Sequence, residues 1–351
     1  MFKYTMKRGL LQLILSFVSF TVLVVFLQSC DKDDNGGTPP VVTPSKPFAE
    51  TGSASWIRET SVTLSGKVVP GNTDTQVSFE YGTTTSYGYV ITADPPTVSG
   101  KEMQDVTTEI SGLIPGTVYY YRLKAQNSVG DTTGLSSTFT TFHPVGYNTS
   151  LTYGSLTDIE GNSYKTIQIG GQTWMADNLR TTTLSDGTTM DIVTDATGWS
   201  NLTTPGVAWY SNNSDVYGAL YNWNAVNTDK LCPDGWHVPS DNEWNTLIEY
   251  LGGEAVAGVK LKEAGISHWL SPNPVTANES GFTALPGGFR NSNGGYGNVN
   301  RYGYWWSSTE RSSADAWTRS VYYGYSNADR SSSSKKSGLA VRCIKDVPDA
   351  P

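Results

Sequence analysis

The sequence predicts a mainly β protein with some α-helix, in which an N-terminal β-sandwich precedes a C-terminal α+β domain. Charged residues make up only 16% of the 351 residues, and Gly, Ser, Thr, Asn and Tyr are abundant. This composition is typical of short strands and turns in extracellular proteins. Most regular segments alternate with a period of two residues, whereas one segment near position 245 has a helical period. The length allows two or three domains.

The first 29 residues have the features of an export signal. An apolar run, Leu10 to Leu27, follows a basic start that contains Lys3, Lys7 and Arg8. The run is just long enough to span a bilayer, so a transmembrane anchor is the alternative. The sequence Leu27-Gln28-Ser29-Cys30 resembles a bacterial lipobox, which implies cleavage before Cys30 and lipidation of that cysteine. We therefore expect a lipoprotein held to the membrane by acyl chains.

Residues 30–47 are predicted to form the lipidated start and a flexible tether. The sequence Asp31-Lys32-Asp33-Asp34 resembles the acidic surface-export signal of lipoproteins in Bacteroidetes-type bacteria, with a solvated charge run as the alternative. Residues 35–47 are rich in Pro, Gly and Thr and lack apolar periodicity. We expect an outer-membrane lipoprotein exposed at the cell surface, with its domains held away from the membrane.

Residues 48–142 alternate in short runs separated by Gly, Pro and Asn turns, which predicts a β-sandwich. The clearest runs are residues 62–68, 77–81 and 118–125. The sequence Leu113-Ile114-Pro115-Gly116-Thr117, together with Tyr119, Tyr121 and the closing run Ser137 to Thr141, resembles the second half of a fibronectin type III domain. The resemblance implies a spacer, and ligand binding by its loops is the alternative.

A linker, residues 143–155, is predicted before a C-terminal domain at 156–346 and a short tail at 347–351. In this domain Ser240 is a natural N-cap and Glu243 completes a capping box, so a helix should begin at Asp241. Gly252 and Gly253 follow as its C-terminal cap. Apolar residues at helical spacing predict one buried face, formed by Trp244, Leu247, Ile248 and Leu251.

Cys232 lies in a Pro/Gly-rich turn before this helix. Because Cys30 is expected to be lipidated, Cys343 remains as the partner of Cys232. The two cysteines are 111 residues apart. In the chain-entropy model, a disulfide that closes a loop of this size contributes roughly 4–5 kcal/mol. We expect it to tie the helix entry to the end of the domain.

The C-terminal half resembles the FISUMP family, named for the Fibrobacter succinogenes major paralogous domain. The motifs that carry the resemblance occur in the family's order: Asp158 to Thr166, Ile169 to Leu179, Tyr217 to Trp223, Cys232 to Trp244, Gly281 to Gly288 and Tyr304 to Glu310. The resemblance implies an architecture more directly than an activity.

Two of the segments are also similar to the C-type lectin fold of formylglycine-generating enzymes. These segments are Gly235 to Trp244 and Gly338 to Cys343. The resemblance implies that the C-terminal domain has a C-type-lectin-like fold, with strands at Trp305 to Ser308, Ala316 to Tyr322 and Leu339 to Ile344. Fold alone does not imply function.

We expect no catalytic residues, no cofactor and no metal site. The histidines His143, His237 and His268 are isolated, without a second His or Glu at helical spacing. The formal charge of −8 and the dispersed Lys and Arg argue against nucleic acid as a partner. An extracellular hydrolase or modifying enzyme remains an alternative because one domain carries several carboxylates: Glu243, Glu263, Glu279, Glu310 and Asp315.

Aromatic, Asn and Gly residues gather in the region from Phe289 to Trp306. Tyr and Trp give rigid contact area with a polar tip, which suits recognition of carbohydrate or protein surfaces. We expect Trp305, Trp306 and Trp317 to pack in the core. We expect three residues of this region to contact a ligand: Tyr296, Arg301 and Tyr302. The predicted function is binding of a glycan or an extracellular protein, and a passive structural role at the cell surface is a further alternative.

Overall fold

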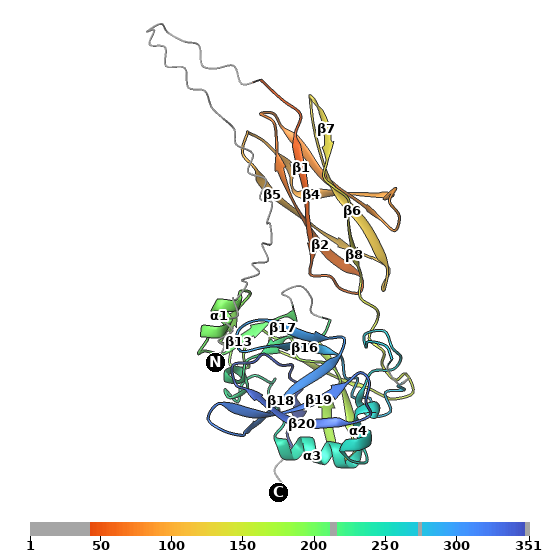
Figure 1. The fold of residues 1–351 in the computed structure, drawn as a ribbon, viewed down its shortest axis with the longest axis vertical. Helices are drawn as coiled ribbons and strands as arrows, with labels where there is room; N and C mark the ends of the chain where they lie inside the picture. Colours follow the sequence, from red (N-terminus) through yellow and green to blue (C-terminus); the bar gives the residue numbers. More distant parts are fainter. Residues whose placement is uncertain (1–42, 211–215, 273–275, 348–351) are drawn as a thin grey trace, which may run out of the picture. The chain divides into compact units, whose positions relative to one another are not determined.

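The computed structural model describes residues 43–210, 216–272 and 276–347 (Figure 1). These residues confirm a mainly β fold with some α-helix. The predicted export signal, Cys30 with its lipobox, and the tether up to residue 42 lie outside the described residues. Within the described ranges, no helix combines the length and the apolar character needed to cross a bilayer.

The predicted sandwich contains eight antiparallel strands. They are β1 (Phe48–Ser55), β2 (Ser61–Val69), β3 (Thr75–Gly82), β4 (Tyr89–Val98), β5 (Gln104–Ser111), β6 (Val118–Asn127), β7 (Gly130–Thr133) and β8 (Ser137–Thr140). The order is β1-β2-β5-β4-β3-β6-β7, with β8 also paired to β6. The three alternating runs lie in β2, β3 and β6 and place Leu64, Phe79 and Leu123 in a shared core. The more specific likeness to fibronectin type III stays a prediction.

Within the described residues, the C-terminal domain contains short strands and four helices. Its elements are β9 (Gly154–Thr157), β10 (Ser163–Ile169), β11 (Gln172–Met175), β12 (Asp191–Ile192), α1 (Ala196–Asn201), β13 (Gly206–Ala208), β14 (Leu220–Tyr221), α2 (Trp223–Val226), β15 (Trp236–His237), α3 (Asp241–Tyr250), α4 (Glu254–Leu261), β16 (Gly287–Arg290), β17 (Tyr296–Val299), β18 (Tyr302–Glu310), β19 (Asp315–Tyr322), β20 (Ala328–Ser334) and β21 (Ile344–Lys345). Three sheets result, with the orders β15-β21-β11-β10-β9, β12-β13-β14 and β17-β16-β18-β19-β20. The third sheet carries the site described below.

Helix α3 begins and packs as the sequence predicts. The Ser240 hydroxyl accepts from the Glu243 amide, and the Glu243 carboxylate accepts from the Ser240 amide at 2.7 Å, so the capping box is complete. The four apolar residues of the predicted face are all buried in one core with Trp174 and Trp305. Helices α3 and α4 lie against β18, β19 and β20 (Figure 1).

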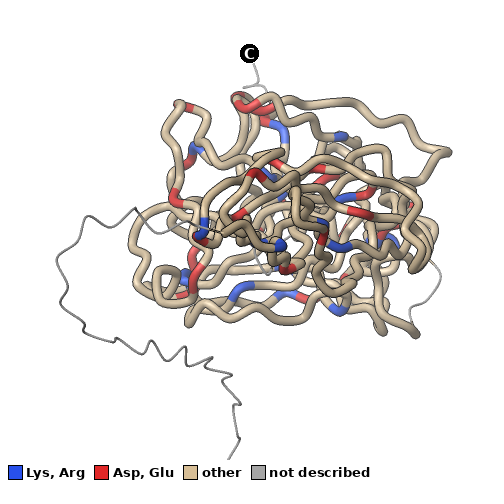
Figure 2. Tube along the Cα trace, turned by 90° about the horizontal axis from the view of Figure 1, so that it is seen from above, with Lys and Arg blue, Asp and Glu red and all other residues tan. Residues whose placement is uncertain are grey.

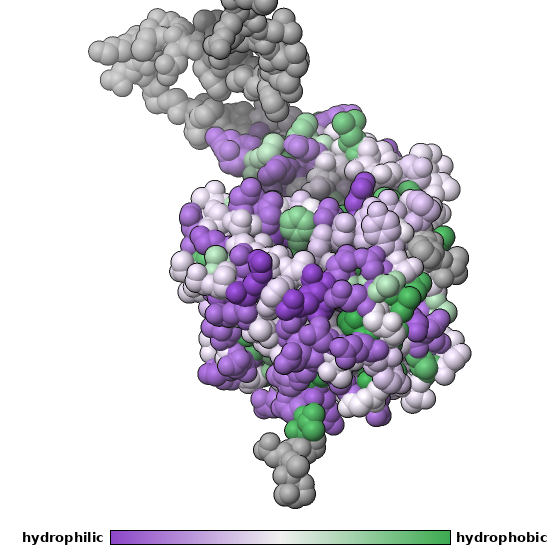
Figure 3. All heavy atoms as spheres, turned by 60° about the horizontal axis from the view of Figure 1, so that its bottom comes forward, coloured by the Kyte–Doolittle hydropathy of each residue, from purple (hydrophilic) through white to green (hydrophobic). Residues whose placement is uncertain are grey.

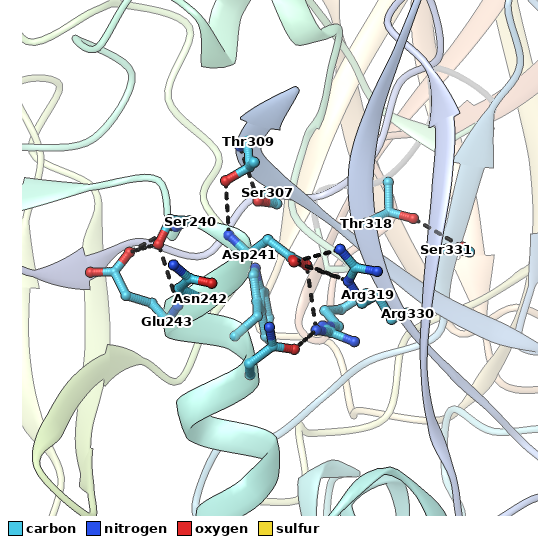
Figure 4. A network of polar contacts seen from close by, with 12 residues as sticks. Ser240, Asp241, Asn242, Glu243, Ser307, Thr309, Thr318, Arg319, Arg330 and Ser331 are labelled. Carbon is cyan, nitrogen blue, oxygen red and sulfur yellow. Dashed lines mark hydrogen bonds and ion pairs between the residues drawn. The ribbon is translucent and has the colours of Figure 1, made fainter. Parts of the chain in front are cut away.

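Asp241 joins the start of α3 to strands β18, β19 and β20 (Figure 4). Its backbone N–H donates to the Thr309 hydroxyl at 3.0 Å. Its carboxylate accepts from Arg330 Nε at 3.0 Å and from a second Arg330 nitrogen at 2.8 Å, and Arg319 approaches it at 3.4 Å. A carboxylate in the first turn also suits the positive end of the helix dipole. Strands β19 and β20 are therefore fixed to the helix entry by charge-assisted hydrogen bonds.

The Cys232–Cys343 disulfide is present, as expected, with a Cα–Cα distance of 5.9 Å. The predicted strand from Leu339 to Ile344 is wrong, because only Ile344–Lys345 forms strand β21. The reason is that successive backbone groups of this segment bond to different neighbours rather than to one strand. Leu339 pairs with Tyr221, whereas the Val341 carbonyl accepts from the Leu179 amide. The closing segment is therefore threaded between several elements.

Trp305 and Trp306 are buried in the core as predicted, but Trp317 is not. Trp317 is half-buried on β19, and the Arg330 guanidinium lies 3.4 Å from the centre of its ring. A cation above a Trp face is favourable and keeps the ring partly in contact with water. The expected core position of Trp317 was therefore wrong.

Basic and acidic residues are interspersed along the chain (Figure 2). The face brought forward in Figure 3 is mainly hydrophilic, with hydrophobic residues in small separate groups.

Replacing Leu247 by Ala should lower the free energy of unfolding by about 2–5 kcal/mol, because its fully buried side chain would leave a cavity. Glu249→Ala on the exposed side of the same helix is the matched control and should change it by less than about 0.5 kcal/mol. Chemical denaturation of both variants measures the difference. Equal effects would show that this helix face does not form the core.

His237 links the C-terminal strand to the capping box. Its Nδ1 lies 2.5 Å from Asp346 Oδ1, and its Nε2 lies 2.8 Å from Glu243 Oε1. Both ring nitrogens can donate only in the protonated imidazolium. Burial lowers the pKa of His237, but the hydrogen bonds to Asp346 and Glu243 outweigh burial and raise the pKa above its usual value. The clamp is therefore tightest when His237 is charged.

The stabilisation from His237 should be complete below the unfolded-state pKa of about 6.5 and should be lost as the pH rises through the higher folded-state pKa. The measurement is the unfolding free energy of the native protein minus that of His237→Gln, from about pH 5.5 to about pH 9. We expect this difference to shrink steadily with pH. Asp346→Asn should flatten the profile, and a difference that grows with pH would contradict the clamp.

Candidate functional site

The three predicted ligand residues lie along the hairpin β16–β17 and the start of β18. Tyr296 is paired with Arg290 across the hairpin, and its ring centre lies 4.8 Å from the Arg290 guanidinium. Arg301 is exposed in the turn between β17 and β18, and Tyr302 is the first residue of β18. Tyr296 thus covers a buried cation, whereas Tyr302 belongs to a different group of rings.

That group is a continuous row of aromatic side chains, which we call the aromatic stripe. Its members are Phe289, Tyr304, Tyr302, Tyr322, Tyr323 and Tyr325. Consecutive ring centres lie 5.6 Å apart for Phe289–Tyr304, 5.1 Å for Tyr304–Tyr302 and 4.5 Å for Tyr302–Tyr322. Tyr322 then contacts Tyr323 at 4.4 Å and Tyr325 at 5.0 Å. Such pairs fix one another in position.

Strand alternation explains why these rings share a face. Successive residues of β18 point to opposite sides, so Tyr302 and Tyr304 lie on one side and Trp305 enters the core on the other. Tyr322 is directly opposite Tyr302 in the antiparallel pair β18–β19, where cross-strand side chains touch. The register of this pair therefore builds the middle of the aromatic stripe.

Three tyrosines of the aromatic stripe, Tyr302, Tyr304 and Tyr322, have a raised hydroxyl pKa. Burial raises the pKa of Tyr304 to about 12 despite the hydrogen bond that Asn298 Nδ2 donates to its hydroxyl at 2.9 Å. Burial and the nearby Asp329 carboxylate raise the pKa of Tyr302. A hydrogen bond with Tyr323 and partial burial raise the pKa of Tyr322 to about 12. These three tyrosines therefore offer neutral hydroxyl donors beside apolar rings.

The turn that carries Tyr323 and Tyr325 is held from below by the end of α4. Lys262 is fully buried, and its ammonium donates to the Tyr323 carbonyl at 2.9 Å and the Tyr325 carbonyl at 3.0 Å. The Val259 amide donates to the Ser326 carbonyl. Gly258 permits the close approach, since a Cβ there would lie 2.1 Å from the Asn327 carbonyl oxygen. The turn is therefore anchored rather than loose.

Of the stripe, only Tyr302 was predicted to contact a ligand. Phe289 and Tyr304 lie in the aromatic region noted in the sequence, and Tyr322 ends an expected strand. The tyrosine-rich run Tyr322-Tyr323-Gly324-Tyr325 could have indicated that further aromatic residues belong to the candidate site. These segments form one group of rings only because β18 and β19 pair in a particular register. That register could not be predicted from the sequence.

The carboxylates considered for hydrolysis have separate partners. Glu243 serves the capping box and His237, Glu310 accepts from Lys335 at 2.7 Å, and Glu263 lies 2.9 Å from His268. Asp315 accepts from the Ser312 hydroxyl, and Glu279 is exposed. Across residues 43–210, 216–272 and 276–347, no three His, Cys, Asp or Glu side chains are grouped so that they could hold a metal ion.

Three of the solved structures that match are remotely similar. A short and a long form of the sensor domain of the anti-sigma factor RsgI4 from Pseudobacteroides cellulosolvens are each 24% identical, with TM-scores of 0.24 and 0.23. They cover 29% and 30% of this chain and 100% and 99% of their own. PhoD is 20% identical over 31% of this chain and 21% of its own, with a TM-score of 0.20. TM-scores this low support no conclusion about function.

No curated protein matches the chain. The family model described as the Fibrobacter succinogenes major domain matches residues 167–345, just over half of the chain. The match includes α3, the disulfide and the whole aromatic stripe. The chain therefore belongs to the Fibrobacter succinogenes major domain family.

Proposed function

We propose that this chain is a cell-surface lipoprotein whose C-terminal domain binds a glycan through the aromatic stripe. Lipidation of Cys30, attachment to the outer membrane and outward display belong to this proposal, and the lipobox-like and acidic sequences support them. The Cys232–Cys343 disulfide adds support, because disulfides persist in oxidising compartments outside the cytosol. The β-sandwich serves as the spacer between tether and C-terminal domain.

The observation that carries the proposal is the uninterrupted succession of ring contacts from Phe289 to Tyr325, in which all rings except that of Phe289 carry a hydroxyl. A sugar presents C–H groups and hydroxyls around one ring, and tyrosine offers both an apolar surface and a hydrogen-bonding tip. Tyr325, at one end, is 61% exposed and gives the most open surface. Its neighbours are half-buried and fixed against one another, so little side-chain entropy is lost on binding.

A protein ligand fits the same surface less well. Protein interfaces of standard size cover about 800 Å² on each partner around a closely packed apolar centre. The aromatic stripe is a row in which most rings contact only the next ring, with Tyr322 as the branching point. A narrow row of this kind suits a slender ligand. Sugar recognition therefore explains the arrangement better.

A glycan array probed with the purified protein tests this function. Tyr325→Ala should weaken binding by about tenfold or more, because truncation of an aromatic anchor costs about 2 kcal/mol. Tyr250→Ala is the matched control, since Tyr250 on α3 is 65% exposed and lies outside the stripe. We expect Tyr250→Ala to bind normally, with or without a chelator.

The outcomes separate the alternatives. No binding by folded protein would contradict the glycan proposal and direct attention to a protein partner or a structural role. Release of sugars from the array over time would instead identify a hydrolase, and Glu310→Gln would then test one carboxylate. Equal losses in Tyr325→Ala and Tyr250→Ala would place the site elsewhere.

A further inference from the structure

Glu263 and His268 form a fully buried pair in the segment that follows helix α4. They are 0% and 2% exposed, and His268 Nδ1 lies 2.9 Å from both oxygens of the Glu263 carboxylate. Burying groups of this kind is costly unless their polar atoms find partners. The further hydrogen bonds of the pair extend to two separate segments, the linker before the C-terminal domain and a turn beside the aromatic stripe.

The first of these segments is the start of the predicted linker. The Gly146 amide donates to Glu263 Oε2 at 3.1 Å, and His268 Nε2 lies 3.1 Å from the His143 carbonyl oxygen. The Ala264 amide donates to the Gly146 carbonyl at 2.7 Å. Glycine permits this close approach, since a Cβ on Gly146 would lie 2.0 Å from the Ala264 carbonyl oxygen. This part of the linker is therefore seated on the C-terminal domain.

The second segment is the turn between β17 and β18, residues 298–301, which we call the site turn. Asn300 Nδ2 donates to the His268 carbonyl at 2.9 Å, and the Leu270 amide donates to the Asn300 carbonyl at 2.8 Å. Tyr217 braces both sides, because its hydroxyl accepts from Asn300 Nδ2 at 3.3 Å and its ring centre lies 5.8 Å from that of His268. The site turn is therefore held by the segment that carries His268.

The site turn leads directly into the aromatic stripe. Tyr302 is the residue that follows it and the first residue of β18. The Tyr323 amide donates to the Arg301 carbonyl at 2.8 Å, so a second tyrosine of the stripe is also fastened to the turn. A continuous path of hydrogen bonds thus runs from the linker through the buried pair to the stripe. Contiguous packed and hydrogen-bonded networks of this kind can carry energetic coupling between distant sites.

We propose that the Glu263–His268 pair couples the seating of the linker to the position of the site turn, and so to ligand binding at the aromatic stripe. The link to ligand binding rests on the function proposed above, whereas the coupling within the protein does not. Release of the linker removes hydrogen-bond partners from a buried carboxylate and a buried imidazole, which is unfavourable until the pair moves. The site turn follows that movement. Glu263 and His268 therefore act as positioning residues, and a bound ligand favours the seated linker in return.

Amide hydrogen exchange of the full protein tests the coupling without any ligand. Gly146→Ala displaces the linker but alters no residue of the pair or of the site turn. We expect it to speed exchange about threefold or more in the site turn and at the Tyr323 amide, as well as in the linker. Gly171→Ala is the matched control, because Gly171 lies in an exposed turn where an added Cβ meets nothing within 4 Å. It should leave these amides unchanged.

A second substitution distinguishes coupling from general loosening. Asn300→Asp keeps the size of the side chain and suits the backbone φ of +61° at this position, but it removes the donor to the His268 carbonyl. In an Asn300→Asp background, Gly146→Ala should lose most of its effect on the Tyr323 amide while it still loosens the linker. Such non-additivity indicates that the two positions share one network. His268→Gln, which should speed exchange in both the linker and the site turn, replaces Gly146→Ala if that variant fails to fold.

A glycan identified on the array gives a second measurement. Gly146→Ala should weaken its binding about fivefold or more, although Gly146 is not part of the aromatic stripe. Saturation of the native protein with the same glycan should slow exchange at the Gly146 amide. Gly171→Ala should bind normally.

The outcomes for the coupling and for the proposed function are separate. Faster exchange of Gly146→Ala in the linker alone, with the site turn as in the native protein, would overturn the coupling and leave the proposed function standing. Full additivity of Gly146→Ala and Asn300→Asp at the Tyr323 amide would do the same. Unchanged glycan affinity of Gly146→Ala would overturn the link to ligand binding. An array without any bound glycan would contradict the proposed function, but not a coupling measured by hydrogen exchange.

Discussion

The buried guanidinium of Arg342 constrains the whole C-terminal domain. Its Nε donates to Asn178 Oδ1 at 2.7 Å, and its other nitrogens donate to the carbonyls of Met175, Phe282 and Thr283. Burial lowers its pKa to about 9. A buried cation without such partners would be strongly destabilising. Segments that are far apart in the sequence must therefore assemble around it together.

This constraint reaches the aromatic stripe through Trp305. Asn178 Oδ1 also accepts from Trp305 Nε1 at 2.9 Å, which holds the inner face of β18 to the Arg342 network. Tyr302 and Tyr304 then have to lie on the other face of β18, where Tyr304 packs against a second core cluster, because neighbouring side chains of a strand point in opposite directions. The buried hydrogen bonds of Arg342 and Trp305 to Asn178 therefore also fix the position of Tyr302 and Tyr304 in the aromatic stripe.

Several cationic side chains are buried inside the C-terminal domain, where they form hydrogen bonds that hold neighbouring segments together. Lys262, Arg290, Arg319 and Arg342 are all buried, and each has carbonyl, amide or carboxylate partners. Arg290 fixes the loop at Thr194 and Asp195, and Arg319 supports the start of α3.

The sequence by itself determined the features that depend on near neighbours. Helix α3 begins at Asp241 and buries one face because its cap and its apolar spacing lie within twelve residues. The sandwich strands follow from alternation, and the disulfide partner followed from the count of cysteines. The prediction that Trp305 and Trp306 lie in the core was also correct, because burial of large apolar side chains is favourable.

The tertiary structure alone decided the candidate site. Tyr296 and Tyr302 looked equivalent in the sequence, but the hairpin places Tyr296 over buried Arg290 and the β18–β19 register places Tyr302 beside Tyr322. The support of the turn by Lys262 joins residues about sixty positions apart. Long-range contacts of this kind carry no local pattern, because their free energy depends on which strands meet and in which register. For that reason the sequence located an aromatic region, and only the folded chain arranged it into a row.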